Sequence, residues 1–367
     1  MPERSGGLDE DMNSNLVCFM ERMPEKVDAA IIQSNENRYY LTGFQSSAGI
    51  IFATREKSYF IIDFRYIEAA RCNVKDCEVV LLENSIEQLN ALIKKHNVSV
   101  IGIENDRMNV YEFKKLRKEL HNCEILDCGC ISRELDSMRM IKSPYEIELI
   151  KQAQDLTART FLHVLDFIKC GKTEKEIALE MEFFIRKCGA DSTAFDFIVV
   201  SGAKTSLPHG TPGEKVIYPG DFITMDFGAC VCGYRSDMTR TVAVSKVTDE
   251  QRAVYDIVLK AQSSALKEIR SGMKCSDVDR IARDIIYNSG YTGCFGHGLG
   301  HSVGIEIHES PSLSPRCDNI LKPGIVTTVE PGIYIEGRFG VRIEDLVVVT
   351  ESGCENLTNS EKSLIIL

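Results

Sequence analysis

The sequence predicts two domains: an α/β domain in the first part of the chain and an α+β domain with an internal pseudo-twofold repeat in the second. Three observations support this prediction. The chain has 367 residues, which is more than one hydrophobic core usually organises. Short apolar strands alternate with helical patterns in the first third of the sequence. In the remainder, the same order of elements occurs twice.

The first domain is predicted from strands that are separated by helices. Residues 86–96 and 111–120 have apolar side chains at helical spacing, which is typical of amphipathic helices. Strands separated by helices favour a partly parallel sheet. We find no catalytic constellation in this part of the sequence. The expected strands cover residues 29–34, 48–54, 59–63, 78–83 and 98–104.

A domain boundary is predicted just before a strong helix start. Ser143 is expected to cap this helix, Pro144 suits the first helical position, and Glu146 can complete a capping box. A long amphipathic pattern follows. The predicted domains cover residues 12–138 and 143–367.

The composition is that of a soluble globular protein, with 44% hydrophobic and 26% charged residues. The net charge of −11 argues against nucleic acid as a partner, because phosphate binding needs a basic face. The polar N-terminus shows no signal peptide, and no apolar run reaches the length of a membrane span. We therefore expect a cytoplasmic protein, with its 14 cysteines reduced and no membrane partner.

The second domain is predicted to contain two similar halves. Each half begins with a long helix, and a glycine then precedes a second helix in residues 168–190 and again in residues 269–291. Thr173 and Ser276 are the expected N-caps of these second helices. A strand beginning Pro-Gly follows in each half, with an acid seven residues after the proline. The repeat suggests two halves that face each other across one site.

Two hairpins are expected to bring four acids together. Asp226 and Asp237 flank a short turn, so they should lie near each other on adjacent strands. Gly337 is the midpoint between Glu330 and Glu344, which predicts that these two acids lie opposite each other. Facing carboxylates repel unless a cation or a proton lies between them. The alternative is four solvated acids on exposed hairpin faces.

The histidines favour a shared site. Of the seven in the chain, His297, His301 and His308 fall within the segment GHGLGHSVGIEIHES, and His209 lies in a turn-rich loop before the first hairpin. Glycines let the backbone approach a site closely, and imidazole is a common metal ligand. The alternative is a glycine-rich loop with incidental histidines. Four carboxylates and one imidazole suit two divalent ions such as Mn²⁺, Co²⁺, Fe²⁺ or Zn²⁺, and paired ions of this kind serve in hydrolysis.

These motifs resemble the creatinase/prolidase/methionine aminopeptidase family, the "pita-bread" metallopeptidases, and within it the Xaa-Pro peptidases. The catalytic motifs are SLPHG, MDFG with GYRSDMTRT, GHGLGHSVG with HE, TVEPGIY, and GVRIED. NRYYLTGF and IIDFRYIEAA are similar to the N-terminal domain of the family, and MRMIKSPYEIELIKQA is similar to the start of its catalytic domain. The resemblance implies a creatinase-like α/β N-terminal domain followed by an α+β pita-bread catalytic domain.

The resemblance also implies a metal-ligand set. Asp226 would chelate one ion, Asp237 and Glu344 would bridge both ions, and His301 with Glu330 would complete the shell of the other ion. Glu330 would in addition act as a proton shuttle, a general acid/base role.

Four further residues receive roles from the resemblance. His308 would steady the tetrahedral intermediate or the substrate carbonyl, and His209 would act near the leaving group or the substrate. Arg342 would support the bridging carboxylates from behind. His297 would shape the pocket.

The implied function is hydrolysis of the peptide bond between an N-terminal residue and proline, the reaction of an Xaa-Pro aminopeptidase. An Xaa-Pro dipeptidase (prolidase) is the first alternative, and a non-catalytic peptide-binding member of the same fold is the second. The prolyl imide lacks an N–H and has a fixed φ, which gives a dedicated enzyme its niche. The cofactor would be two divalent ions, with Mn²⁺ preferred over Co²⁺, Zn²⁺ or Fe²⁺, and the enzyme would be a homodimer.

Overall fold

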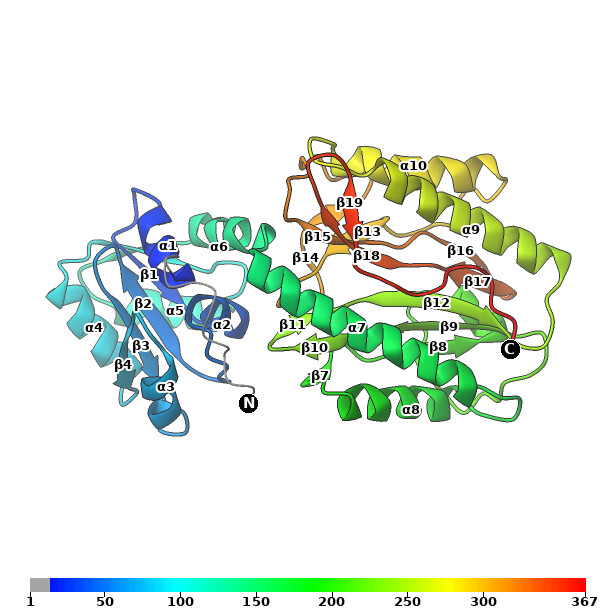
Figure 1. Cartoon of the computed structure of the whole chain (residues 1–367). Helices are drawn as coiled ribbons and strands as arrows, with labels where there is room; N and C mark the ends of the chain where they lie inside the picture. The colour runs from blue at the N-terminus through cyan, green and yellow to red at the C-terminus, as the bar shows by residue number, and fades with distance from the viewer. Residues whose placement is uncertain (1–13) are drawn as a thin grey trace. The chain divides into compact units, whose positions relative to one another are not determined.

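The computed structural model describes residues 14–367 of the chain. The chain divides into two compact units, of which the first ends at Arg139 and the second runs from Met140 to Leu367. Figure 1 shows both units, which we describe one at a time. The expected absence of a signal peptide and the predicted domain start at residue 12 fall outside the described residues.

The first unit is built on a mixed six-stranded sheet with strand order β4-β3-β2-β1-β5-β6. Strand β1 pairs with β5 in parallel and with β2 antiparallel, so the expectation of a partly parallel sheet is confirmed. The strands are β1 (Ala29–Ile32), β2 (Ile50–Thr54), β3 (Ser58–Ile62), β4 (Glu78–Leu81), β5 (Val100–Ile103) and β6 (Glu124–Leu126). The helices are α1 (Asn15–Arg22), α2 (Asn35–Thr42), α3 (Ile67–Asn73), α4 (Ser85–Lys95), α5 (Val110–Glu119) and α6 (Cys130–Met140).

All five predicted strands and both predicted helices of this unit are present. The two helices pack through the apolar positions that predicted them, as Leu89 and Ile93 of α4 show by their burial against the sheet. The helices α1, α2, α3 and α6 were not predicted. Two of them begin at serine caps that are visible in the sequence, since Ser14 accepts a hydrogen bond from the Val17 amide and Ser34 accepts one from the Asn37 amide.

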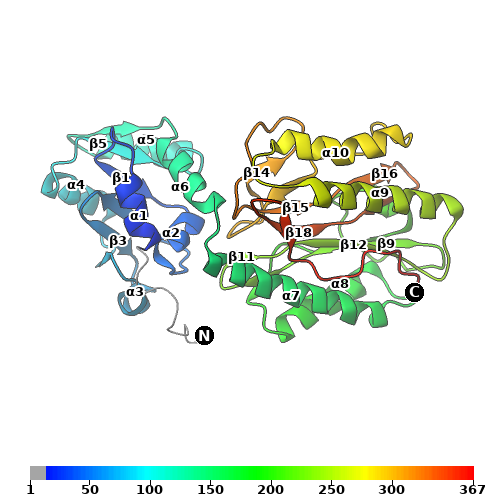
Figure 2. The same cartoon turned by 45° about the horizontal axis from the view of Figure 1, so that its top comes forward.

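The second unit places its strands between two pairs of helices, α7–α8 and α9–α10 (Figures 1 and 2). The helices are α7 (Pro144–Phe167), α8 (Glu174–Lys187), α9 (Asp249–Glu268) and α10 (Cys275–Asn288), with a 3₁₀ turn η1 (Gly202–Ser206). The first-half strands are β7 (Ser192–Thr193), β8 (Ile198–Ser201), β9 (Phe222–Phe227), β10 (Ala229–Val231), β11 (Tyr234–Arg235) and β12 (Met238–Ala243). The second-half strands are β13 (Gly300–Ser302), β14 (Glu309–Leu313), β15 (Val326–Val329), β16 (Gly332–Ile335), β17 (Phe339–Arg342), β18 (Asp345–Val349) and β19 (Cys354–Asn356).

Local capping explains where the helices of this unit begin. The predicted capping box at Ser143 is present, with Pro144 in the first turn. Thr173 caps α8 as predicted. The prediction that Ser276 caps α10 is wrong, because the helix begins at Cys275 and its N-cap, Lys274, makes no side-chain hydrogen bond to the helix. The backbone carbonyl groups of Cys317 and Asn319 accept the hydrogen bonds of the first amides instead.

The alternation of side chains along the strands creates an inner polar face in each half. In β9, Ile223, Met225 and Phe227 pack against α7 and α8, so Thr224 and Asp226 point to the opposite face. In the second half, the apolar residues of β15, β17 and β18 pack with α9 and α10 in the same manner. The acids therefore lie on the faces that turn away from the helices.

Both predicted hairpins are present. The first turns at Cys232 and Gly233, which both have positive φ, and it places Thr239 of β12 opposite Asp226. The second turns at Gly337 and pairs Gly332 with Arg342. Strands β15 and β18 continue the same register, with Val329 opposite Asp345. Glu330 and Glu344 therefore lie opposite each other, as their midpoint predicted.

Candidate metal centre

Three of the predicted ligands come together in the second unit. One carboxylate oxygen of Asp237, one of Glu344 and one ring nitrogen of His301 all lie within 4.8 Å of one another. The Nε2 atom of His301 is 3.5 Å from Asp237 Oδ2 and also 3.5 Å from Glu330 Oε1. Asp237 comes from the first half, whereas Glu344, His301 and Glu330 come from the second half. The two halves thus contribute to one cluster.

Asp226 joins the cluster from strand β9. Its charge acts on the carboxyl groups of Asp237, Glu330 and Glu344, which shows that the four acids share one electrostatic environment. The Arg342 guanidinium donates a hydrogen bond of 2.7 Å to Asp226 Oδ2, and both side chains are largely buried. The structure therefore brings all five predicted ligands together.

The cluster contains more buried carboxyl groups than the Arg342 guanidinium can neutralise. Burial raises the pKa of Asp237 well above its usual range, and the neighbouring Glu344 raises it further. Burial raises the pKa of Glu330 to about 8, and it also raises the pKa of Glu344. The Oδ1 atoms of Asp226 and Asp237 are buried without a hydrogen-bond partner. Carboxylates seldom remain buried in this condition without a cation, so the residues fit divalent metal ions.

Two threonines hold carboxylates of the cluster by hydrogen bonds. Thr239 donates to Glu344 Oε2 at 2.7 Å, and Thr328 donates to Glu330 Oε1 at 3.2 Å. Arg342 Nε donates to the Thr239 hydroxyl at 3.0 Å. Neither threonine was predicted from the sequence. Each lies two positions from an acid of the cluster in a strand, and this spacing, which places side chains on one face, could have identified them.

His301 and His308 lie side by side, with ring centroids 4.3 Å apart. Burial lowers the pKa of His301 to about 4, which keeps its imidazole neutral and able to bind a metal ion. The half-buried His308 also has a lowered pKa, because of burial and then because of the nearby His209. His209 is exposed, so it borders the cluster from the solvent side.

His297 is part of a hydrogen-bonded chain that reaches Asp226. Its Nδ1 is 2.8 Å from the Gly298 carbonyl oxygen and its Nε2 is 2.9 Å from the Tyr334 hydroxyl. A carbonyl oxygen can only accept, so Nδ1 carries the proton and the Tyr334 hydroxyl donates to Nε2. Arg342 in turn donates to Tyr334 at 3.0 Å. Tyr334 was not predicted as a site residue. Its position between Ile333 and Ile335 of β16 could have suggested that its hydroxyl has a hydrogen-bond partner inside the protein.

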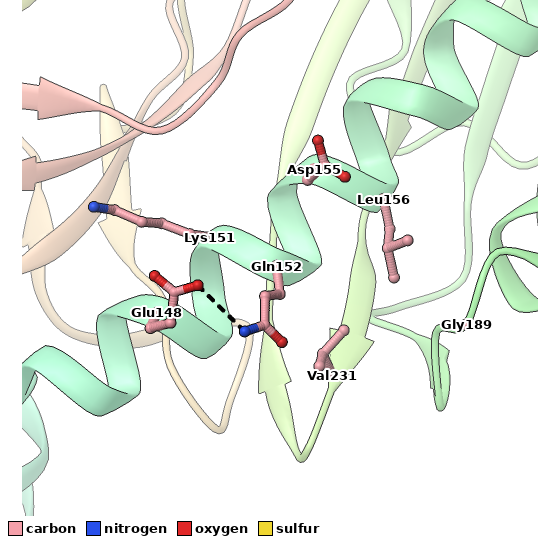
Figure 3. Close-up of a pocket in the computed structure, with 7 residues that line it drawn as sticks. All are labelled: Glu148, Lys151, Gln152, Asp155, Leu156, Gly189 and Val231. Carbon is pink, nitrogen blue, oxygen red and sulfur yellow. Dashed lines mark hydrogen bonds between the residues drawn. The ribbon is translucent and has the colours of Figure 1, made fainter. Parts of the chain in front are cut away.

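A surface groove on α7 does not share this chemistry (Figure 3). It has a volume of about 490 Å³ and contains none of the predicted ligands. Its acids Glu148 and Asp155 are exposed, and Glu148 accepts a hydrogen bond from the Gln152 side chain. Solvated acids of this kind need no cation, so the buried cluster remains the candidate site. The residues that line the groove are Glu148, Lys151, Gln152, Asp155, Leu156, Gly189 and Val231.

A two-half fold that buries four carboxylates and an imidazole around one point defines a metal-dependent enzyme. Comparison with known proteins makes this class specific. Residues 148–351 match the metallopeptidase family M24, and residues 20–141 match the creatinase/prolidase N-terminal domain. The chain belongs to metallopeptidase family M24.

Similar proteins cover nearly the whole chain. The uncharacterized peptidase YqhT of Bacillus subtilis is 42% identical over 342 residues, which are 93% of this chain and 96% of that protein. The solved structure of an Xaa-Pro dipeptidase from Bacillus anthracis has a TM-score of 0.92 at 38% identity and covers 96% of this chain and 99% of its own. The structure of an X-Pro aminopeptidase from Thermotoga maritima has a TM-score of 0.88 at 38% identity and covers 95% of this chain and 99% of its own.

These comparisons confirm the predicted fold and the predicted family. The fold is a creatinase-like N-terminal domain followed by a pita-bread catalytic domain. Membership of the family implies divalent metal ions, which agrees with the unpartnered Oδ1 atoms of Asp226 and Asp237 in the cluster. Within residues 14–367, none of the helices is long and apolar enough to cross a membrane.

Proposed function

We propose that the chain hydrolyses the peptide bond between an N-terminal residue and proline, as an Xaa-Pro aminopeptidase. The observation that carries this proposal is the convergence of the five predicted ligands with unpartnered carboxylate oxygens among them. The Xaa-Pro specificity is supported by the names of similar proteins, an Xaa-Pro dipeptidase and an X-Pro aminopeptidase.

The proposed ligand set holds two divalent ions, with Mn²⁺ preferred because the donors are mostly carboxylate oxygens. Asp226 would hold one ion, His301 with Glu330 would hold the other, and Asp237 and Glu344 would be shared by both. The short distances from His301 Nε2 to Asp237 and Glu330 support this division. When bound, such ions lower the pKa of a water molecule and polarise the scissile carbonyl.

Glu330 is proposed to move a proton during the reaction. The leaving group is the secondary amine of proline, which needs a proton when the bond breaks. The Thr328 hydroxyl holds the Glu330 carboxyl group 3.5 Å from His301, in a position where it would accept a proton from water and donate it to the departing amine.

The remaining polar residues are proposed to bind and orient. His308, beside His301 and half-buried, steadies the substrate carbonyl as its oxygen becomes negative. The exposed His209 meets the substrate or the leaving group at the mouth of the site. Arg342 holds Asp226 and Thr239, and through Thr239 it supports Glu344. His297 shapes the pocket through its hydrogen bond to Tyr334.

An Xaa-Pro dipeptidase is the second candidate, and a relative of that name supports it. A non-catalytic peptide-binding role predicts lost ligands, and the convergence of all five favours an enzyme. We further propose that the enzyme is a cytoplasmic homodimer that acts on peptides with proline in the second position. The proposed domain boundaries are residues 12–138 and 143–367.

The test is an assay of the full chain with added Mn²⁺ on Xaa-Pro dipeptides and Xaa-Pro-Xaa tripeptides. Cleavage that is faster for tripeptides supports the aminopeptidase, and cleavage restricted to dipeptides supports the dipeptidase. If metal analysis shows bound ions and neither peptide is cleaved, the proposed Xaa-Pro specificity is wrong.

A further inference from the structure

The loop that leads into the histidine cluster is rich in glycine. Residues 289–299 connect α10 with β13, and the last part of this loop, residues 295–299, includes Gly296 and Gly298. His301 follows at the centre of β13. A glycine-rich segment has more conformations to lose on folding than other segments do. A metal ligand, however, must be held within about half an ångström of its position. Something outside the loop must therefore fix it.

Helix α10 supplies that restraint through one arginine. The Nη1 atom of Arg283 donates to the Phe295 carbonyl at 2.8 Å, and its Nη2 atom donates to the His297 carbonyl at 2.7 Å. The planar guanidinium thus spans Gly296 and fixes the main chain on both sides of it. The guanidinium also lies over the Phe295 ring, 4.2 Å from its centroid.

An aspartate one turn earlier on the helix completes the restraint. Asp279 is 1% exposed and binds Arg283 through two hydrogen bonds, of 2.7 and 2.8 Å. Its Oδ1 atom also accepts a hydrogen bond of 3.0 Å from the Leu299 amide. The ion pair therefore contacts the loop at three backbone positions, the last of which is two residues before His301.

The restraint continues from the loop to a second proposed ligand. The Leu299 carbonyl accepts a hydrogen bond of 2.7 Å from the Glu330 amide. Asp279 and the Glu330 backbone are therefore separated by a single residue of the loop. The ion pair on α10 is thus connected through the loop backbone to His301 and to Glu330, whose side chains are 3.5 Å apart.

We propose that Asp279 and Arg283 are positioning residues for the metal ion held by His301 and Glu330. Their hydrogen bonds to the loop go to its backbone, at Phe295, His297 and Leu299, and not to the proposed ligand side chains. They fix the loop backbone, and through it the separation of His301 and Glu330. This inference rests on the proposed function, because it requires those two residues to be ligands.

The same helix carries a matched control. Arg280 donates to Asp277 at 2.8 Å, one turn away on the exposed side of α10, with side chains 67% and 42% exposed. Replacing Arg280 removes an ion pair from the same helix without touching the loop. Exposed pairs of this kind contribute little to stability.

The experiment compares Arg283→Met, Arg283→Lys and Arg280→Met in the full chain. Each metal-depleted protein is titrated with Mn²⁺ in a calorimeter, and its melting temperature and kinetics are recorded. Arg283→Met is expected to weaken binding of one Mn²⁺ ion by roughly 10- to 100-fold and to lower kcat more than it raises KM. Arg283→Lys keeps the charge but not the planar fork, so partial recovery is expected. Arg280→Met is expected to match the wild type.

The outcomes separate this inference from the proposed function. If the wild-type chain binds no Mn²⁺, the proposed metal site fails. If the wild type binds and cleaves normally while folded Arg283→Met and Arg283→Lys both match Arg280→Met in Mn²⁺ affinity and kcat, the positioning role is overturned. Should Arg283→Met fail to fold, Arg283→Lys is compared with Arg280→Met instead. Equal Mn²⁺ affinity and equal kcat of these two variants would then overturn the positioning role.

Discussion

The two halves of the catalytic unit use the same construction to hold different parts of the site. In the first half, the buried Glu174 at the start of α8 accepts hydrogen bonds from the Ser201 amide at 2.8 Å and the Gly213 amide at 3.1 Å. It thereby anchors both ends of the loop that carries His209. In the second half, Asp279 of α10 anchors the loop that leads to His301.

The two loops differ in the environment of the histidine that each of them positions. His209 is exposed, whereas His301 is largely buried beside Asp237 and Glu330, and burial lowers its pKa to about 4. The first-half loop therefore suits contact with substrate, and the second-half loop suits contact with metal. The two halves therefore share a helix with a buried acid that anchors a loop, but the loops serve different chemical roles.

The largest expected effect comes from Glu330, because its counterpart in the first half, Asp226, has no proposed role in proton transfer. Glu330→Gln should lower kcat by about 10²- to 10⁴-fold, because the amide can neither carry the proton nor balance the metal charge. Steady-state kinetics together with metal analysis would measure this loss. Turnover close to that of the wild type would refute the proton role of Glu330.

Removal of the metal tests whether the acids of both halves share one site. In the metal-free chain, burial raises the pKa of Glu330 to about 8 and raises the pKa of Asp237 and Glu344. The folded state then holds protons that the unfolded state has released, so stability falls as the pH rises through these folded pKa values. His297 and His301, with pKa values of about 4, act in the opposite direction, but only below about pH 6.5, where an unfolded imidazole is protonated.

The melting temperature of the chelator-treated chain should therefore fall between about pH 6.5 and pH 8. Added Mn²⁺ should restore it, because a cation offsets the charges from both halves at once. A melting temperature of the metal-free chain that is constant or rises over this pH range would contradict a shared cluster of buried acids.

A smaller effect is expected from the anchor of the first half. Glu174→Gln should loosen the His209 loop and lower kcat/KM by roughly tenfold, while Mn²⁺ affinity stays at the wild-type value. Glu214→Gln is the matched control, because Glu214 forms an exposed ion pair with Lys175, also on α8. A loss of Mn²⁺ affinity in folded Glu174→Gln would show that the two anchors do not differ as proposed.

The smallest expected effect concerns Tyr334. Tyr334→Phe removes its hydrogen bonds with His297 and Arg342 but keeps the ring, so a loss of about 1 kcal/mol, or roughly fivefold in kcat/KM, is expected. Kinetics with one Xaa-Pro-Xaa peptide would measure it. A loss as large as that of Glu330→Gln would instead give the Tyr334 hydroxyl a direct part in the reaction.

The sequence predicted what depends on spacing along the chain. The midpoint at Gly337 predicted the pairing of Glu330 with Glu344, since hairpin register follows directly from the turn. The N-cap at Thr173 was also predicted, because it depends only on residues of the same helix start. These features require only neighbouring residues, and the structure confirms both.

The sequence did not predict what depends on contacts between distant segments. Ser276 has the right residue type for a cap, but the first amides of the helix donate to the carbonyl groups of Cys317 and Asn319 instead. Asp279 and Arg283 form an ordinary pair, four residues apart on a helix, until the loop at residues 295–299 packs against them. Thr239 of β12 contacts Glu344 and Arg342 from the other half of the unit, and Tyr334 of β16 contacts His297 from a distant loop.

The turn at Gly337 sets the register of the second hairpin, and this register determines where residues can be inserted without moving the acids. One residue inserted into either arm would move every side chain beyond it to the opposite face and would remove Glu344 from the cluster. Residues added at the exposed tip, between Glu336 and Arg338, would leave both arms in register. A peptide tag or fluorescent reporter inserted at this tip should therefore leave both acids in place.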